Sequence, residues 1–161
     1  MPEPVRQIEP EFFEKLGRLL QHWALLDARL VDLLAACLHA DPGMTLLLAH
    51  TVSGATITDW VRKMSSVLDT PEDSLKKLES ILREIDELRA DRNALVHGVW
   101  ATDASDTGTI LVQTVRLHGM QPVRQRLVTL ADLDELICIT LEIYERLRAF
   151  LLAHRLLGKG A

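Results

Sequence analysis

Apolar residues recur at helical spacing along most of the chain. Over 12–37 they return every three or four positions, and Pro10 stands where a first helical residue would be, which predicts one helix of about thirty residues. The Asp-Pro-Gly sequence at 41–43 is expected to end it. Helical spacing resumes over 44–68, but glycine and β-branched residues at 51–54 predict a break within that region.

Two further helices follow, and each has its own start signal. Thr70, followed by a proline and two acids, predicts an N-cap for a helix whose apolar spacing extends over 75–96. Thr129 and Asp132 have the spacing of a capping box. They predict the start of a last helix, in which apolar residues recur over 133–151.

The pattern between these two helices is that of strands. The segments 109–118 and 123–129 are rich in β-branched residues and predict an antiparallel hairpin, with 99–102 as a candidate third strand. The expected fold is therefore mainly α. It is an up-and-down bundle of four to five helices, with a small antiparallel hairpin or meander inserted at about 99–129, within a single domain over 1–161.

Composition limits the classes of partner. A net charge of −5 makes the whole chain a poor attractant for nucleic acid, so any polyanion would have to meet a local basic patch. No apolar run is long enough for a bilayer and the N-terminal sequence lacks the features of a signal peptide, so we expect no membrane and a cytoplasmic location. Cys37 and Cys138 lie in Leu-rich helical patterns and are expected to be buried free thiols.

Several kinds of site are absent from the sequence. There is no glycine-rich phosphate loop, no paired-cysteine zinc spacing and no His-Glu-x-x-His sequence. Four histidines are spread along the helices without a partner at metal-ligand spacing: His22, His39, His50 and His154. We therefore expect no metal and no cofactor.

The stretch RNALVHG at the end of the 75–96 helix carries the candidate chemistry. It can be read as a helix end, with Gly98 as the cap, His97 at the negative end of the helix dipole and the stem of Arg92 covering apolar neighbours. However, the apolar seam places Arg92 among Leu, Ile and Val positions, and a guanidinium held there requires an anion from the protein or from a ligand. Asn93 and His97 are four residues apart and share a helix face.

These residues resemble the Arg-x4-6-His motif of the HEPN superfamily. The string Arg-Asn-x-Leu-Val-His-Gly-x-Trp, from Arg92 to Trp100, is similar to one that recurs in bacterial HEPN-like proteins with a hairpin after the motif. The resemblance implies a metal-independent endoribonuclease, often a homodimer and commonly a toxin or defence effector. It also implies that His97 acts as base or acid, Arg92 as the phosphate clamp and Asn93 as an orienting hydrogen-bond partner.

The spacing of the motif adds a geometric condition. Positions five apart on an ideal helix are separated by about 140° around its axis, so Arg92 and His97 of one chain do not stand side by side. Either the helix loosens at His97, or a second subunit completes the site. We expect a homodimer in which the two motif helices meet.

The predicted hairpin is locally basic. It contains Arg116, Arg124 and Arg126 and no acid, which predicts either an RNA backbone track or a docking surface for an acidic partner such as an antitoxin. A sheet face paired with acids of a neighbouring helix is the alternative. Trp100 is a candidate for stacking on an RNA base, and a core anchor otherwise.

Two functions remain open. The first is a HEPN-type endoribonuclease, with RNA as its substrate and an antitoxin or another protein as a partner. The second is a non-catalytic HEPN-like dimeric module that binds protein or nucleic acid, in which Arg92 and His97 only hold the helix end or the dimer.

Overall fold

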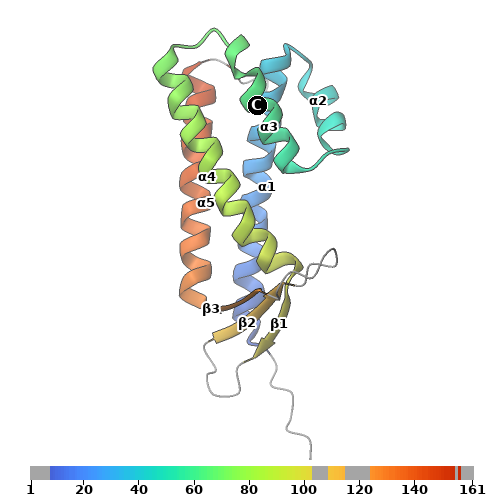
Figure 1. Cartoon of the computed structure of the whole chain (residues 1–161), viewed down its shortest axis with the longest axis vertical. Helices are drawn as coiled ribbons and strands as arrows, with labels where there is room; N and C mark the ends of the chain where they lie inside the picture. The colour runs from blue at the N-terminus through green and yellow to red at the C-terminus, as the bar shows by residue number, and fades with distance from the viewer. Residues whose placement is uncertain (1–7, 103–108, 115–123, 155, 157–161) are drawn as a thin grey trace, which may run out of the picture.

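The computed structural model describes residues 8–102, 109–114, 124–154 and 156. It confirms a mainly helical fold with a small sheet inserted before the last helix (Figure 1). The elements of the described residues are α1 (Pro10–Leu38), α2 (Pro42–Ala49), α3 (Gly54–Met64), the 3-10 turn η1 (Ser65–Val67), α4 (Glu72–His97), β1 (Val99–Thr102), β2 (Thr109–Thr114), β3 (Arg124–Thr129) and α5 (Leu130–Ala153). The break predicted over 51–54 is the turn between α2 and α3.

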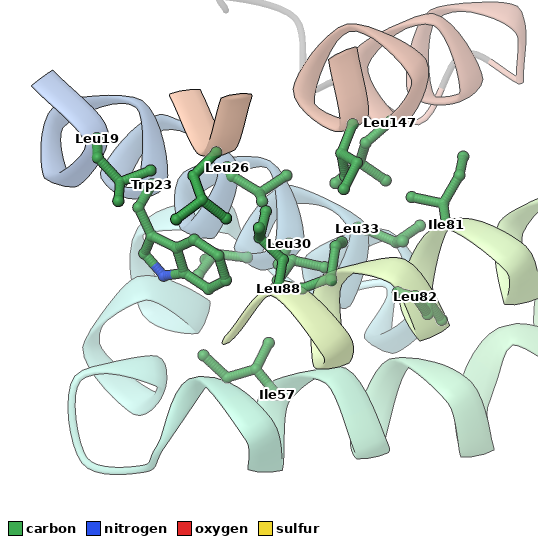
Figure 2. Close-up of a cluster of buried hydrophobic side chains, with 14 of the residues drawn as sticks. Leu19, Trp23, Leu26, Leu30, Leu33, Ile57, Ile81, Leu82, Leu88 and Leu147 are labelled. Atoms are coloured by element: carbon green, nitrogen blue, oxygen red, sulfur yellow. The ribbon is translucent and has the colours of Figure 1, made fainter. Parts of the chain in front are cut away.

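The core is built from leucines on one face of α1. Figure 2 shows these side chains meeting Ile57 of α3, Leu88 of α4 and Leu147 of α5. The three long helices α1, α4 and α5 lie along the length of the molecule, and α3 packs against α1 (Figure 1). Burial of this aliphatic seam is the main stabilising term of such a bundle.

The sheet is antiparallel with strand order β1-β2-β3. The candidate third strand is thus confirmed, whereas 115–118 and 123 of the expected hairpin lie outside the described residues. Ile110 pairs with Val128, and Val112 lies between Trp100 and Arg126. Side chains alternate between faces along a strand, and the buried Ile110, Val112 and Val128 define the face that packs on the helices.

The predicted N-cap is confirmed for α5 but not for α4. The capping box of α5 is complete, because the Thr129 hydroxyl accepts from the Asp132 amide and the Asp132 carboxylate accepts from the Thr129 amide at 2.7 Å. The prediction that Thr70 caps α4 is wrong. Pro71, with ψ 144°, stands outside the helix and occupies the cap position, which leaves the Thr70 hydroxyl without a partner among the described residues.

The Asp-Pro-Gly sequence also acts differently from the prediction. Helix α1 ends at Leu38, and His39 adopts a left-handed conformation with φ 50°. Asp41 instead caps α2, since its carboxylate accepts from the Met44 amide at 3.1 Å, and Pro42 is the first residue of that helix. The sequence at 41–43 therefore starts the next helix rather than ending the previous one.

The two cysteines differ in environment. Cys37 is buried and desolvation raises the pKa of its thiol to about 11, so it is an inert core residue. The expectation of a buried thiol is wrong for Cys138, which is exposed because it lies on the outer side of α5, next to the buried Ile137. In the described part of the chain no single helix is long and apolar enough to cross a membrane, and α1 and α2 meet that test only as a pair bent by 118°.

Gly98 joins α4 to the sheet where the two approach closely. Its backbone is extended, with φ −76°, so no left-handed conformation requires glycine there. A Cβ at this position would overlap the Ala94 carbonyl oxygen and the Val112 side chain, well inside 3.0 Å. Gly98 is therefore needed for space, and it sets how near the end of α4 comes to β2.

We expect Gly98→Ala to lower the free energy of unfolding by about 1–3 kcal/mol, because backbone and strand must separate to admit the methyl group. Gly17→Ala is the matched control. Gly17 lies in α1 with nothing within 4 Å of an added Cβ, so this change is expected to stabilise by roughly 0.5–1 kcal/mol. Urea denaturation measures both, and equal effects of the two substitutions would contradict the close approach.

Candidate active site

The motif lies in the last turns of α4, and the helix remains regular through His97. Loosening at His97, the way in which a single chain could bring Arg92 and His97 together, is therefore not observed. The two side chains keep the angular separation of about 140° of an ideal helix. His97 is exposed in the last turn, where the helix dipole favours a positive charge.

Arg92 lies at the edge of the core, as the apolar seam predicts. Its Cζ is 5.5 Å from the centre of the Trp23 ring, a cation–π contact with a residue of α1. Its Nη1 donates a hydrogen bond of 2.8 Å to the side-chain oxygen of Asn93. Asn93 therefore orients Arg92 in this structure, and no bond joins Asn93 to His97 among the described residues.

A second arginine, not singled out from the sequence, joins this site. Arg89 lies one turn before Arg92 on α4, and its Cζ is 5.7 Å from the same Trp23 ring. Its guanidinium donates to the Thr58 hydroxyl at 3.1 and 3.2 Å and to Asp86 at 3.0 Å. It also lies against Gly54, the first residue of α3. The i, i+3 spacing of two arginines on an apolar seam was the available signal.

Asp27 is an acid that interacts electrostatically with both arginines of this pair. It lies one turn after Trp23 on α1, and burial raises the pKa of its carboxyl. The positive charges of Arg89 and Arg92 and the indole of Trp23 lower that pKa without cancelling the effect of burial. The Asp27 carboxyl therefore interacts electrostatically with both guanidiniums, although its oxygens lie more than 4.0 Å from their nitrogens.

Two polar atoms of this cluster have no partner. Nε of Arg92 and Oδ1 of Asp27 are buried and without a hydrogen bond among the described residues. No carboxylate of those residues lies within 4.0 Å of the Arg92 nitrogens. Arg89, in contrast, has Asp86 as a direct counterion. The Arg92 guanidinium is therefore fixed in place by Trp23 and Asn93, without a carboxylate of the described residues in direct contact.

Among the predicted RNA-binding residues of the hairpin, Arg126 does not join the Arg92 site. Arg126 pairs with Asp91 of α4, which matches the alternative of a sheet face paired with acids of a neighbouring helix. It shares its face of β3 with the buried Val128. The side chain of Arg124 and the whole of Arg116 lie outside the described residues.

Trp100 is placed as an anchor. Its indole Nε1 donates to the Leu95 carbonyl oxygen at 2.8 Å. Its ring stacks on Phe13 of α1 with 5.7 Å between centroids and 14° between planes. The indole thus joins β1 to α4 and α1, with its donor already used and one ring face covered.

A cavity of about 450 Å³ lies beside α4, between the sheet and α5. Its inner wall is apolar and includes the buried Leu95, Val112 and Val128, while Asp91 and Arg126 also line it. Arg92 is not among the lining residues. The cavity is therefore separate from the cluster around Trp23.

The described residues contain no group of three His, Cys, Asp or Glu side chains that could hold a metal ion. Of the four dispersed histidines, His154 packs on Phe150 with 4.6 Å between ring centroids. No family model, curated protein or solved structure matches this chain.

We expect Asp27→Asn to raise the melting temperature at pH 7. The folded pKa of Asp27 lies above its ordinary value of 3.8, so the folded protein binds this proton more tightly than the unfolded chain does. The ionised carboxylate therefore costs stability at neutral pH, and this cost disappears as the pH falls below 3.8. Calorimetry from pH 7 to 3.5 should show a gain that shrinks to zero.

Asp69→Asn, which changes an exposed carboxylate after η1, serves as the control and should leave the melting temperature unchanged at neutral pH. A loss of stability in Asp27→Asn at pH 7 would show instead that attraction to Arg89 and Arg92 exceeds the cost of burial.

Proposed function

We propose that this chain is a metal-independent endoribonuclease of HEPN type that acts as a homodimer. In each composite site, Arg92 of one chain would hold the scissile phosphate and His97 of the other would transfer protons. The observation that carries the proposal is the Arg92 guanidinium, which Trp23 and Asn93 position and which no carboxylate of the described residues contacts. An external anion would complete its surroundings.

The chemistry needs few groups. A base removes the proton of the ribose 2′-hydroxyl, the oxygen attacks the adjacent phosphorus, and the 5′-oxygen leaves with a proton from an acid. Histidine is the side chain that exchanges protons near neutral pH. A guanidinium fork stabilises the charge that develops on the phosphate oxygens. No step requires a metal.

The helix geometry supports a second chain in this proposal. Arg92 faces α1 through Trp23, whereas His97 is exposed in the final turn. A regular helix holds them on different faces. A two-fold axis that brings together the motif ends of two α4 helices would place the Arg92 of each chain opposite the His97 of the other.

We further propose that the protein serves as a toxin or defence effector, with an antitoxin or another protein as its partner. Because the chain as a whole carries a net charge of −5, its overall charge would not attract RNA. In this proposal RNA binds through local positive charge, at the Arg89–Arg92 pair and at Arg124 on β3.

A non-catalytic dimeric module that binds protein or nucleic acid is the second candidate. The packing roles of Arg92 and Trp100 support it, since both side chains already make contacts that hold α4 to α1 and to the sheet. In that case the motif would stabilise the helix end and would bring no reaction.

The first test is cleavage of labelled RNA of mixed sequence in the presence of a chelator. We expect the wild type to cleave, and His97→Ala and Arg92→Ala to lose 100-fold or more in rate, a loss on the order of one catalytic acid–base or oxyanion contact. Circular dichroism checks that each variant is folded. Arg148→Ala, at an exposed position of α5, is the matched control and should keep the wild-type rate.

Mixing the two inactive variants tests the composite site. In a heterodimer of His97→Ala with Arg92→Ala, one of the two sites carries both substitutions and the other carries none. Random exchange of subunits should therefore restore roughly a quarter of the wild-type rate. A mixture that exchanges subunits and stays inactive would place both residues in a site within one chain, and full activity of either single variant would remove the endoribonuclease proposal.

A further inference from the structure

The cavity beside α4, which we call the α4 cavity, combines an apolar wall with a polar mouth. Its volume of about 450 Å³ is within the range of pockets that hold small organic molecules. Figure 1 shows the sheet at the end of the bundle where α4 ends and α5 begins, and residues of all three line the cavity. Because its wall comes from helices and strands, the cavity is formed before a ligand arrives.

The mouth carries an ion pair. Among the described residues that line the cavity, the charged ones are Asp91 of α4 and Arg126 of β3, and both side chains are nearly half exposed. Nη1 of Arg126 donates to Oδ1 of Asp91. A guanidinium has further N–H donors and a carboxylate has a second acceptor oxygen, and neither group makes another hydrogen bond within the described part of the chain. The mouth therefore offers a donor and an acceptor side by side.

The charges at the mouth limit the class of ligand. An anion is opposed by Asp91. It is also opposed by Asp132, whose carboxyl pKa is lowered by hydrogen bonds from Thr129 and by the charge of Arg126. A cation would be repelled by Arg126, and a purely apolar chain would leave the donor and the acceptor desolvated without a partner. The cavity therefore fits an uncharged molecule that has an apolar body and an edge with both donors and acceptors.

A nucleobase is a molecule of this kind. It is an uncharged flat ring, and its edge carries N–H donors next to nitrogen or oxygen acceptors. Proteins that recognise a single unstacked base pack its ring against apolar or aromatic side chains and form hydrogen bonds to its edge. The buried Leu95, Val112 and Val128 supply the first kind of contact, and the Asp91–Arg126 pair supplies the second.

The α4 cavity also lies next to His97. Ala90 and Ala94 line the cavity, and residues at positions i, i+4 and i+7 follow one row along a helix. Ala90 and His97 are separated by only about 20° around the helix axis, whereas Arg92 and His97 are separated by about 140°. The exposed His97 therefore stands at the end of the row of residues that lines the cavity.

We infer that the α4 cavity binds one base of an RNA strand, in the nucleotide that lies beside His97. The ring packs on the apolar wall, and its edge forms hydrogen bonds to Asp91 and Arg126. The assignment to RNA rests on the proposed function, whereas the binding of a nucleobase rests on the cavity alone. A free nucleoside carries the same ring, so the experiments below use both sources.

Two-dimensional NMR during titration tests the site. The probes are the four ribonucleosides and a short RNA whose 2′-hydroxyls are methylated, which leaves no nucleophile for cleavage. We expect the signals of Leu95, Val112 and Val128 to shift. Ala94→Leu fills the cavity with an aliphatic side chain and should raise the dissociation constant by roughly 10-fold or more. Ala149→Leu, at an exposed position of α5 outside the cavity, is the matched control and should bind like the wild type.

A second variant tests the polar mouth without changing the core. Asp91→Ala removes the acceptor and should weaken binding by roughly 10-fold, while the loss of an exposed ion pair leaves the fold intact. Glu87→Ala, one turn earlier on α4, exposed and outside the lining residues, should change nothing. Wild-type affinity in both Ala94→Leu and Asp91→Ala, or no shift with either probe, would overturn the inference.

The base site and the proposed function fail in different ways. A wild type that never cleaves RNA but binds nucleosides through the cavity would keep the base site and remove the endoribonuclease. Cleavage by Ala94→Leu with unchanged kcat and KM would keep the endoribonuclease and contradict the placement of a substrate base in the cavity. Methylated RNA should bind at least 10-fold more tightly than free nucleosides, and equal affinities would contradict the assignment to an RNA strand.

Discussion

Two guanidiniums of α4 pack against one tryptophan of α1, and this contact ties the motif-bearing part of α4 to the aliphatic core on which the bundle depends. The apolar seam of α4 is interrupted by Arg89 and Arg92 where it crosses α1, and Trp23 offers an aromatic ring to both. A smaller aliphatic residue on α1 would leave these charges without a favourable surface. Arg89 also donates a hydrogen bond to the Thr58 hydroxyl, so the same guanidinium links α4 to α3.

Local features of the fold could be predicted because they depend on nearby residues. The length of α1, the capping box at Thr129 and the third strand follow from spacing and side-chain chemistry within a few positions. The prediction that Thr70 caps α4 is wrong for an equally local reason, since Pro71 occupies the cap position. The burial of Cys138 depends on which side of α5 packs on α1 and α4. The spacing of apolar residues alone did not distinguish the buried position 137 from the exposed position 138.

The candidate site could be predicted only in part, because its partners come from distant segments. Arg92 and Asn93 are neighbours in sequence, but Trp23 and Asp27 belong to another helix, and no spacing rule links them to α4. The pairing of Arg126 with Asp91 likewise depends on how the sheet packs on α4. Contacts between distant segments depend on how the whole chain packs. The residue types therefore indicated the candidate chemistry, whereas only the structure identifies the side chains that surround Arg92 and Arg126.

The bond from the Trp100 indole to the Leu95 carbonyl ends α4 in an uncommon way. The last four carbonyls of a helix lack intrahelical donors, and here a side chain from the following strand supplies one of them. The final turn, which carries His97, is thus fastened to β1. It cannot fray alone, because opening that turn also breaks the hold on the strand. Its local opening is coupled to that of the sheet, so the two belong to one cooperative unit of unfolding.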